Sequence, residues 1–199
     1  MLSDKLLALN LVTYNSAATL LTCIAALDRQ TFRAFSISVF DNASIDGTLD
    51  WLKSRPDITL SANTTNIGYA AAHNRLIDQT TSEYVLTLNP DVALDPGYLA
   101  AIVAALDADP QTGSAAGGLL RVEHLDEIPT QIDSVGLFMR RNRRDVSQEV
   151  RQPRFDPLSP ARVIGVDPSH PAVQFVHPLT DHRPRPAQFP FRLALPAPP

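Results

Sequence analysis

The segment that decides the fold is Leu6-Leu-Ala-Leu-Asn-Leu-Val-Thr13, followed at once by Tyr14-Asn15-Ser16. Its run of mostly apolar residues has the length of a β-strand that is buried on both faces. Ser16 then stands where it could cap a helix, because apolar residues recur at helical spacing after it. The segment therefore predicts a buried strand that leads through a short polar turn into a helix.

The same order of strand and helix repeats along the front of the chain. Further strands are predicted at residues 35–40, 58–61 and 83–88. Further helices are predicted after Asp46, over residues 70–79 and after Pro96. Strands that alternate with helices of this length indicate an α/β fold, with a mainly parallel sheet and helices on both of its faces.

Length and composition narrow the class of protein. The chain has 199 residues, of which 44% are apolar and 19% charged, and these values are typical of a globular protein. Its net charge of −4 gives no electrostatic basis for nucleic acid as the main partner. No stretch reaches the ~18–20 apolar residues of a membrane span, and the first residues do not resemble a signal peptide. A cytoplasmic location is therefore expected.

Cys23 is the only cysteine, so it cannot form an internal disulfide bond. Its place in an apolar helical run predicts a buried, unreactive thiol rather than a nucleophile.

Proline separates the front of the chain from its end. Five prolines precede residue 150 and twelve follow it, nine of them between Asp167 and Pro199. This density leaves no room for a normal helix. Three histidines in the same stretch are spaced too irregularly to indicate a metal site. We expect a main domain over residues 1–140, a partial continuation over 141–166, and an irregular or disordered tail over 167–199.

Each of the four predicted strands ends in polar side chains. In an open parallel sheet, ligands bind in the crevice at the carboxyl ends of the strands. These ends read, in chain order, Thr13-Tyr-Asn-Ser16, Asp41-Asn-Ala-Ser44, Asn63-Thr-Thr-Asn-Ile-Gly-Tyr69 and Asn89-Pro-Asp91. Four polar ends at one edge of a sheet predict a ligand site. The sequence has neither of the usual glycine-rich phosphate loops, so a nucleotide would have to be held differently.

Two aspartates after the second strand each allow a functional and a structural interpretation. The Asp41 carboxylate could accept the imino hydrogen of a uracil or thymine ring, or it could stabilise a turn or helix entry. Asp46 stands directly before Gly47, Thr48 and an apolar helix, and this position favours a helix cap.

Asp91 is the candidate metal ligand. A divalent cation commonly neutralises the charge of a pyrophosphate leaving group. Mg²⁺ or Mn²⁺ then needs only one or two protein carboxylates, because phosphate oxygens and water complete its coordination shell. Asp91 follows a strand end on a turn stiffened by Pro90. The alternative is an ordinary Asn-Pro-Asp turn.

Four segments together resemble family 2 glycosyltransferases of the GT-A fold, especially their rhamnosyltransferase-like branch. They are Leu11-Val-Thr-Tyr-Asn15, Val39-Phe-Asp-Asn-Ala-Ser-Ile-Asp-Gly-Thr48, Asn66-Ile-Gly-Tyr-Ala-Ala-Ala-His-Asn74 and Leu88-Asn-Pro-Asp-Val92. The resemblance covers roughly residues 6–140, and its specificity comes from four motifs in the same order at matching separations. It implies that the main domain binds a nucleotide sugar.

The resemblance implies a role for each strand end. The residues that would line the base and ribose site are Thr13, Tyr14, Asn15, Asp41, Asn42 and Ser44, with Asp41 reading the base. Those that would border the nucleotide and its phosphates are Asn66, Gly68 and Asn74. Asn89-Pro90-Asp91 would replace the family's Asp-x-Asp motif, so that metal binding rests on Asp91 alone. The implied donor is a dTDP- or UDP-sugar, with dTDP-rhamnose the best single choice.

The chain departs from the family pattern after residue 166. Family members continue through a Gly-Ala-rich segment to an acidic motif that supplies the general base. Here residues 162–166 resemble the approach to that segment, but Asp167-Pro-Ser-His-Pro171 does not. Asp167 and Asp181 are the only acidic residues that follow, so the catalytic residues stay unknown, and a frameshift or truncation near residue 166 is expected.

The resulting expectation is a glycosyltransferase domain with impaired transfer to a glycan or lipid-linked acceptor. The alternative is a nucleotide-sugar-binding module, or pseudoenzyme, without transfer activity. Four arginines between residues 140 and 144 could attach the chain peripherally to the inner membrane face, although Asp145 and Glu149 dilute this cluster.

Overall fold

The computed structural model describes residues 6–108, 112 and 114–122, and the backbone of five later strands. The chain divides into two compact units. Unit 1 comprises Met1–Ala17, Ala34–Pro90 and His177–Pro199, and unit 2 comprises Ala18–Arg33 and Asp91–Val176. The domain boundaries expected at residues 140 and 166 lie outside the described residues.

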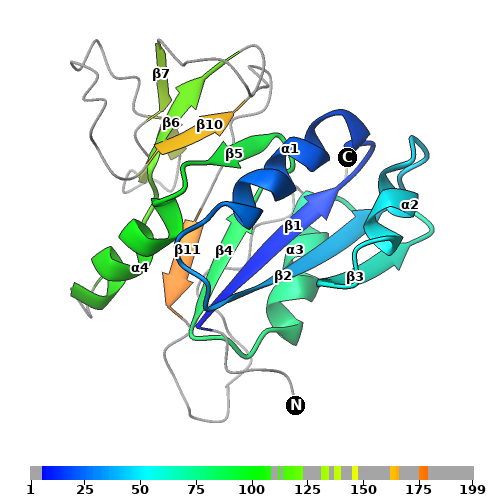
Figure 1. Cartoon of the computed structure of the whole chain (residues 1–199), viewed down its shortest axis with the longest axis horizontal. Helices are drawn as coiled ribbons and strands as arrows, with labels where there is room; N and C mark the ends of the chain where they lie inside the picture. The colour runs from blue at the N-terminus through cyan, green and yellow to red at the C-terminus, as the bar shows by residue number, and fades with distance from the viewer. Residues whose placement is uncertain are drawn as a thin grey trace. The chain divides into compact units, whose positions relative to one another are not determined.

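Unit 1 is built on a parallel sheet. Its strands are β1 (Leu7–Thr13), β2 (Phe35–Asn42), β3 (Ile58–Asn63) and β4 (Tyr84–Leu88), in the spatial order β4-β1-β2-β3 (Figure 1). Strand β11 (Phe175–Pro178) is assigned to the edge next to β4. The parallel register pairs Thr13 with Asp41 at the carboxyl ends of β1 and β2. All four strand ends therefore meet at one edge of the sheet.

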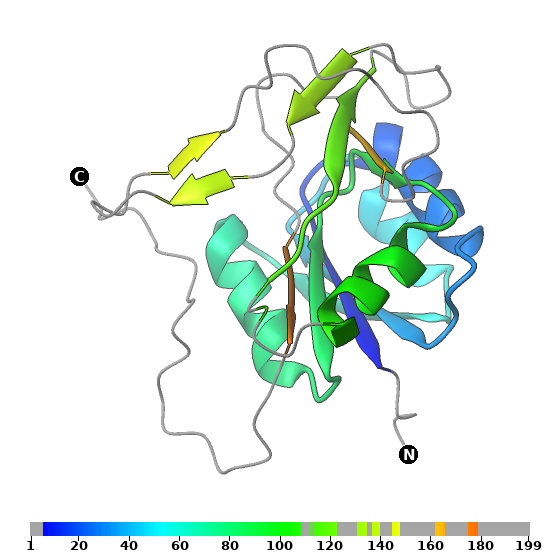
Figure 2. The same cartoon turned by 90° about the vertical axis from the view of Figure 1, so that its left-hand side faces the viewer.

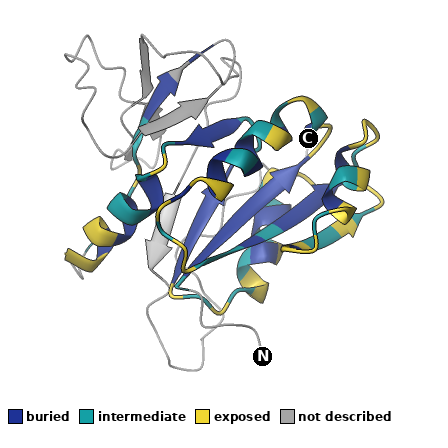
Figure 3. Ribbon diagram, viewed as in Figure 1, coloured by how far each residue is buried: buried dark blue, intermediate teal, exposed yellow. Residues whose placement is uncertain are grey.

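The interior of this sheet follows from the apolar character of β1. All seven residues of β1 are buried, and Figure 3 shows it as a dark central strand between β2 and β4. Edge strand β3 is mostly half-buried or exposed. A parallel strand with neighbours on both sides is typically an almost continuous apolar run, and residues 6–13 predict this correctly, with Asn10 and Thr13 as its buried polar residues.

Two helices belong to unit 1, α2 (Thr48–Lys53) and α3 (Tyr69–Gln79). Helix α3 lies along one face of the sheet, as the view in Figure 2 shows. Its residues Ala72 and Leu76 form a buried cluster with Val12 of β1 and Phe40 of β2. This cluster fixes the start of α3 close to the carboxyl ends of the strands.

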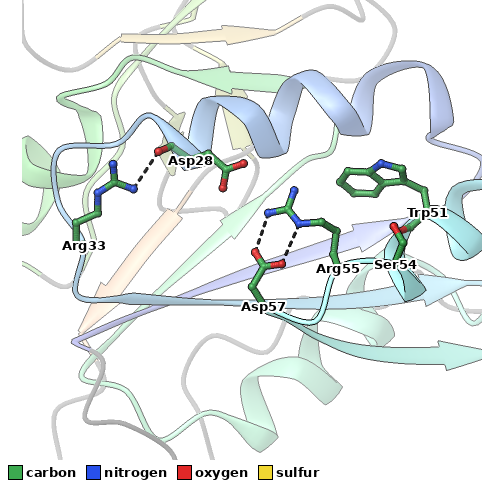
Figure 4. Close-up of polar contacts among 6 residues, drawn as sticks. All are labelled: Asp28, Arg33, Trp51, Ser54, Arg55 and Asp57. Atoms are coloured by element: carbon green, nitrogen blue, oxygen red, sulfur yellow. Dashed lines mark hydrogen bonds and ion pairs between the residues drawn. The ribbon is translucent and has the colours of Figure 1, made fainter.

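The turn between α2 and β3 holds an ion pair (Figure 4). Arg55 donates from Nε to Asp57 Oδ1 at 2.8 Å and from Nη2 to Asp57 Oδ2 at 2.7 Å. Its guanidinium also lies 5.5 Å from the centre of the Trp51 ring. These contacts are at the end of β3 where the strand begins, away from the polar strand ends.

Unit 2 contains α1 (Ala17–Asp28) except for its first residue, α4 (Tyr98–Ala108) and a second sheet. This sheet has the order β5-β10-β6-β7, with strands Val92–Leu94, Arg162–Gly165, Gly118–Arg121 and Gln131–Ser134. A separate hairpin pairs β8 (Leu137–Met139) with β9 (Asp145–Ser147).

Buried Gln30 connects the end of α1 to the start of α4. Its Nε2 donates to the Asp95 carbonyl at 2.7 Å, and its Oε1 accepts from the Leu99 amide at 3.1 Å. Arg33 closes the same turn by donating to the Asp28 carbonyl at 2.9 Å (Figure 4). Gln30 Nε2 also lies 3.3 Å from the Ala26 carbonyl in the last turn of α1, so one buried side-chain amide satisfies backbone groups at the end of one helix and at the start of the next.

The predicted fold class is confirmed as a parallel sheet flanked by helices. The strands after β4 were not predicted individually, and two of them bear directly on the expectations. Strand β5 directly follows Asp91, and β11 lies inside the proline-rich stretch that was expected to be irregular. Phe175-Val176-His177 is free of proline, and Pro178 ends an edge strand, where a missing N–H is tolerated. Within the described residues, no helix has the length and apolar character needed to cross a membrane.

Candidate functional site

The ends of β1 and β2 are joined through Asp41. Thr13 Oγ1 donates to Asp41 Oδ2 at 2.9 Å, and the Ser44 hydroxyl donates to the same oxygen at 2.6 Å. The Ser44 amide donates to Asp41 Oδ1 at 3.0 Å. Asp41 is fully buried. A carboxylate offers about four acceptor positions, so these three bonds leave one position for another donor.

The loops that follow β1 and β2 interlock above Asp41. The Asn15 amide donates to Ser44 Oγ, and the Ile45 amide donates to Asn15 Oδ1, each at 2.9 Å. Asn15 and Ala43 have positive φ angles of 50° and 69°. Asparagine tolerates this region, whereas for alanine it costs about 1–2 kcal/mol. The mutual hydrogen bonds hold both loops in this less favoured conformation.

Asp46 ties the starts of two helices together. Its Oδ2 accepts from the Ala17 amide at 2.9 Å, and its Oδ1 accepts from the Thr48 amide at 3.1 Å and from the Thr48 hydroxyl at 2.6 Å. The Thr48 hydroxyl, followed by the Ala17 amide, lowers the pKa of Asp46. Asp46 is therefore held as a carboxylate between the two loops.

Both helix caps expected from the sequence need correction. The N-cap of α2 is Gly47, in a left-handed conformation with φ 92°, although Asp46 does accept from the first amide of that helix. The Ser16 hydroxyl is hydrogen-bonded to the backbone of Tyr14 instead of capping α1. The Ser16 contacts are local, within its own turn, whereas Asp46 is also held by the Ala17 amide of the other loop, a contact that local sequence does not reveal.

The ends of β2 and β3 are joined by two amide side chains. Asn42 Nδ2 donates to Asn66 Oδ1, which also accepts from the Gly68 amide, and both distances are 2.8 Å. Asn42 Oδ1 accepts from the Ile67 amide at 2.8 Å. Gly68 has φ 84° and ψ 158°, a conformation that essentially only glycine adopts. These bonds shape the loop that leads into α3.

The end of β4 is joined to the start of α3. The Tyr69 hydroxyl donates to Asn89 Oδ1 at 2.8 Å. The Tyr69 ring in turn meets the ring of buried His73 edge-on, with 4.3 Å between centroids. Burial lowers the pKa of His73 to about 4, so that its imidazole is neutral at neutral pH.

The predicted site residues in unit 1 fall into two layers. Those that are buried are Thr13, Asp41 and Asn42, and those that are exposed or half-buried are Tyr14, Asn15, Ser44, Asn66, Gly68 and Asn89. The buried residues organise the loops, and the outer residues are accessible to a ligand. Asn74 is half-buried on α3, and the contacts described for unit 1 do not connect it to this network.

Asp91 opens unit 2 and is half-buried. Burial, followed by the negative charge of Asp91, raises the pKa of Cys23 to about 12. The described residues contain no cluster of three or more His, Cys, Asp or Glu side chains that could hold a metal ion. Asp91 is the single carboxylate that the sequence predicts as a metal ligand. One carboxylate suits a cation such as Mg²⁺ or Mn²⁺, which takes most of its ligands from phosphate and water.

Two contributors were not identified as site residues from the sequence. The sequence favours only a helix cap for Asp46, and it assigns no role to Tyr69. Their positions in the sequence carry a weak signal, since each lies within or next to a polar strand-end loop. Their partners, Ala17 and Asn89, are 29 and 20 residues away in the chain.

Known proteins match the chain in sequence and in structure. The profile of glycosyl transferase family 2 matches residues 10–158. An N-acetylglucosaminyl-diphospho-decaprenol L-rhamnosyltransferase from Mycobacterium tuberculosis (strain ATCC 25618 / H37Rv) is 34% identical over 122 residues. That match covers 55% of this chain and 39% of the relative, so the chain spans about two-fifths of the curated protein.

Among solved structures, a mannosyltransferase from Pyrobaculum calidifontis in complex with GDP-Man and Mn²⁺ superposes with a TM-score of 0.51 and 27% identity. The superposition covers 60% of this chain and 36% of the mannosyltransferase. The profile match spans most of the chain, including the ends of all four strands of the parallel sheet. This chain belongs to glycosyl transferase family 2.

Proposed function

We propose that the chain binds a dTDP- or UDP-sugar together with Mg²⁺ or Mn²⁺, as the donor-binding part of a glycosyltransferase. The observation that carries this proposal is the hydrogen-bonded network that links the four strand ends of unit 1. Thr13, Asp41 and Ser44 hold one part of it, and Asn42, Asn66 and the Tyr69–Asn89 pair hold the other. A site that is ordered before the ligand arrives loses less conformational entropy on binding.

The nucleobase is proposed to lie against the exposed ring of Tyr14, next to Asn15 and Ser44. Tyr14 is 54% exposed, and an aromatic face offers a stacking surface for a base. Asp41 is proposed to accept the imino hydrogen of uracil or thymine with its remaining acceptor position. Because Asp41 is fully buried, this contact requires the Ser44 hydroxyl to shift when the base enters, while the bonds from Thr13 and from the Ser44 amide keep the carboxylate in place.

The metal is proposed to bind Asp91 and the diphosphate. Only Pro90 separates Asp91 from Asn89 in the sequence. A divalent cation there would neutralise charge on the departing nucleoside diphosphate. The Mn²⁺ in the related mannosyltransferase complex supports a cation of this class.

The donor sugar is proposed to be rhamnose and the acceptor a lipid-linked glycan, as the name of the mycobacterial relative suggests. Residues 1–199 alone are proposed to transfer sugar weakly. Residues 166–199 contain only Asp167 and Asp181 as carboxylates, and neither lies in an acidic motif. A general base contributes about 10²–10⁴-fold to the rate.

Calorimetry with dTDP, UDP and CDP, each with and without Mn²⁺, tests donor binding. We expect dTDP and UDP to bind more tightly than CDP, because the cytosine ring has no imino hydrogen at the same position. Asp91→Ala should abolish the gain in affinity from Mn²⁺. Asp57→Asn, at the opposite end of β3, is the control and should bind like the unmodified chain. Equal binding of all three nucleotides, or none, would contradict the proposal.

Asp41→Asn separates base reading from loop ordering. If Asp41 reads the base, the variant loses its preference for UDP over CDP. If Asp41 only orders the loops, the affinity for both nucleotides falls by the same factor.

The second candidate is a nucleotide-sugar-binding module without transfer activity, favoured because residues 166–199 carry no acidic motif. An assay with dTDP-rhamnose and a polyprenyl-diphosphate-linked N-acetylglucosamine acceptor distinguishes the two. Metal-dependent binding without product supports the module, and product formation at a rate typical of an intact enzyme supports the transferase.

A further inference from the structure

Asn89 stands at the strand end where the family motif has its first acidic residue, and a neighbouring side chain holds it. The Tyr69 hydroxyl donates to Asn89 Oδ1 at 2.8 Å, which joins the first residue of α3 to the residue after β4. The two residues are 20 positions apart in the sequence. An amide side chain on a half-buried strand end has several rotamers, and this bond selects one of them.

Tyr69 is itself held on its other side. Its ring meets the ring of His73 one helical turn later, at 4.3 Å between centroids and an angle of 65°. His73 is fully buried, whereas the Tyr69 side chain is 41% exposed. Edge-on contact with a buried ring is a favourable aromatic geometry. It restricts the direction in which the Tyr69 hydroxyl can point.

The chemistry of His73 fits a packing role. Neither of its ring nitrogens has a hydrogen-bond partner among the described residues. A buried imidazole without partners is stable only in its neutral form, and the low pKa of about 4 agrees with this. His73 therefore contributes a flat, uncharged ring beneath Tyr69, not a charge or a proton.

We propose that Tyr69 is a positioning residue of the nucleotide-sugar site: held by the buried ring of His73, it fixes the Asn89 side chain toward the donor diphosphate. This inference rests on the proposed function. It adds two residues, Tyr69 and His73, that act on the ligand only through Asn89.

A double-mutant cycle tests the proposal. Tyr69→Phe keeps the ring and removes only the hydroxyl, and Asn89→Ala removes the side chain that the hydroxyl holds. We expect Tyr69→Phe to weaken Mn²⁺-dependent binding of dTDP by about three- to tenfold, the value of one hydrogen bond. In the Asn89→Ala background the same substitution should have no effect, because the two residues act as one unit.

A conservative variant and a matched control complete the cycle. Asn89→Asp keeps an acceptor for the hydroxyl, so Tyr69→Phe should weaken binding in this background as well. Tyr98→Phe is the control, since Tyr98 is a buried tyrosine of unit 2 whose hydroxyl accepts from the Gly117 amide at 3.3 Å. It should leave dTDP affinity unchanged. An equal loss in Tyr69→Phe with and without Asn89 would overturn the proposal.

His73 is tested with His73→Leu, which keeps a buried apolar side chain but removes the ring. We expect dTDP affinity to fall by about two- to fivefold, and Tyr69→Phe to add little to that loss. If His73→Leu bound dTDP with full affinity, the claim that the His73 ring holds Tyr69 in place would be wrong. His73→Phe keeps an aromatic ring and should bind like the unmodified chain, so a loss there would also count against the proposal.

A measurement without ligand separates this inference from the proposed function. The side-chain amide signal of Asn89 in a ¹⁵N spectrum should move in Tyr69→Phe and stay in Tyr98→Phe. If the unmodified chain binds no nucleotide, both the proposed function and this inference fail. If it binds nucleotide but Tyr69→Phe matches it in affinity and in spectrum, only this inference fails.

Discussion

His73 shows how one buried residue makes stability depend on pH. Its pKa is lowered by burial to about 4 in the folded chain, against about 6.5 when unfolded. Between these values the unfolded chain binds a proton that the folded chain does not. Stability from the neutral ring is therefore fully present above the unfolded pKa and is lost as the pH falls toward the folded one.

We expect acidification from about pH 7.5 to about pH 5 to remove about 2 kcal/mol of unfolding free energy through His73 alone. In His73→Leu, which has no titrating group at this position, the loss of unfolding free energy over the same pH interval should be smaller by this amount. Urea unfolding of both proteins at the two pH values measures the difference. Parallel losses in the two proteins would show that His73 is accessible to protons in the folded state.

Cys23 is the second residue whose environment sets its chemistry. Burial, followed by the charge of Asp91, raises the pKa of its thiol to about 12. At about pH 8 only about one thiol in 10⁴ would be ionised, and the thiolate is the reactive form. We expect iodoacetamide to modify Cys23 slowly in the native chain and readily in urea. Equal rates in both conditions would contradict its burial.

At the residue scale, the sequence predicted the burial and chemical character of single side chains, but not their hydrogen-bond partners. A buried, unreactive Cys23 follows from its apolar surroundings, and the structure confirms the burial. The bonds from Asp46 to Ala17 and from Tyr69 to Asn89 could not be predicted, because each spans 20 or more residues and depends on strand register. Local sequence predicted that Asp46 caps a helix. In the structure one of its carboxylate oxygens accepts instead from the Ala17 amide in the other loop.

At the scale of elements, two glycines open the helices of unit 1 with different backbone conformations. Gly47 before α2 has φ 92° and ψ −7°, and Gly68 before α3 has φ 84° and ψ 158°. A Cβ at either position would meet no atom within 4 Å. Any cost of alanine there is therefore a backbone cost and not a clash.

We expect Gly47→Ala to lower the unfolding free energy by about 1 kcal/mol, because non-glycine residues do visit the left-handed region. Gly68→Ala should cost more, about 2–3 kcal/mol, because its conformation is essentially restricted to glycine. Urea unfolding of the two variants compares them directly. A smaller loss for Gly68→Ala than for Gly47→Ala would mean that the loop from Asn66 to Gly68 rearranges at little cost.

The elements themselves were largely predictable. Strand β1 was expected at residues 6–13 and runs over Leu7–Thr13. The prediction succeeds because a short apolar run followed by a polar turn is typical of a buried strand. Strand β5 was missed, since Val92–Leu94 is only three residues long and directly follows a turn. Strand β11 was missed because proline density outweighed a short apolar run.

At the scale of the whole molecule, cooperativity should follow the position of each strand in the parallel sheet. Strand β1 pairs with β2 on one side and β4 on the other, and all seven of its residues are buried. Strand β3 pairs with β2, and most of its residues are half-buried or exposed. Amides of a strand that is covered on every side exchange with solvent only when the sheet opens as a whole.

We expect hydrogen exchange to be slowest in β1, with protection close to the global unfolding free energy, and faster in β3. Saturating dTDP and Mn²⁺ should raise the protection of β1 by the binding free energy, about 2.7 kcal/mol when the ligand is at 100 times its Kd. Asp91→Ala should lose this metal-dependent gain while keeping the same order of strands. Exchange measured by mass spectrometry tests both parts. If β1 exchanged as fast as β3, the sheet would not be the cooperative core of unit 1. If the protection of β1 did not change when ligand is added, ligand binding at the polar strand ends would not stabilise the parallel sheet.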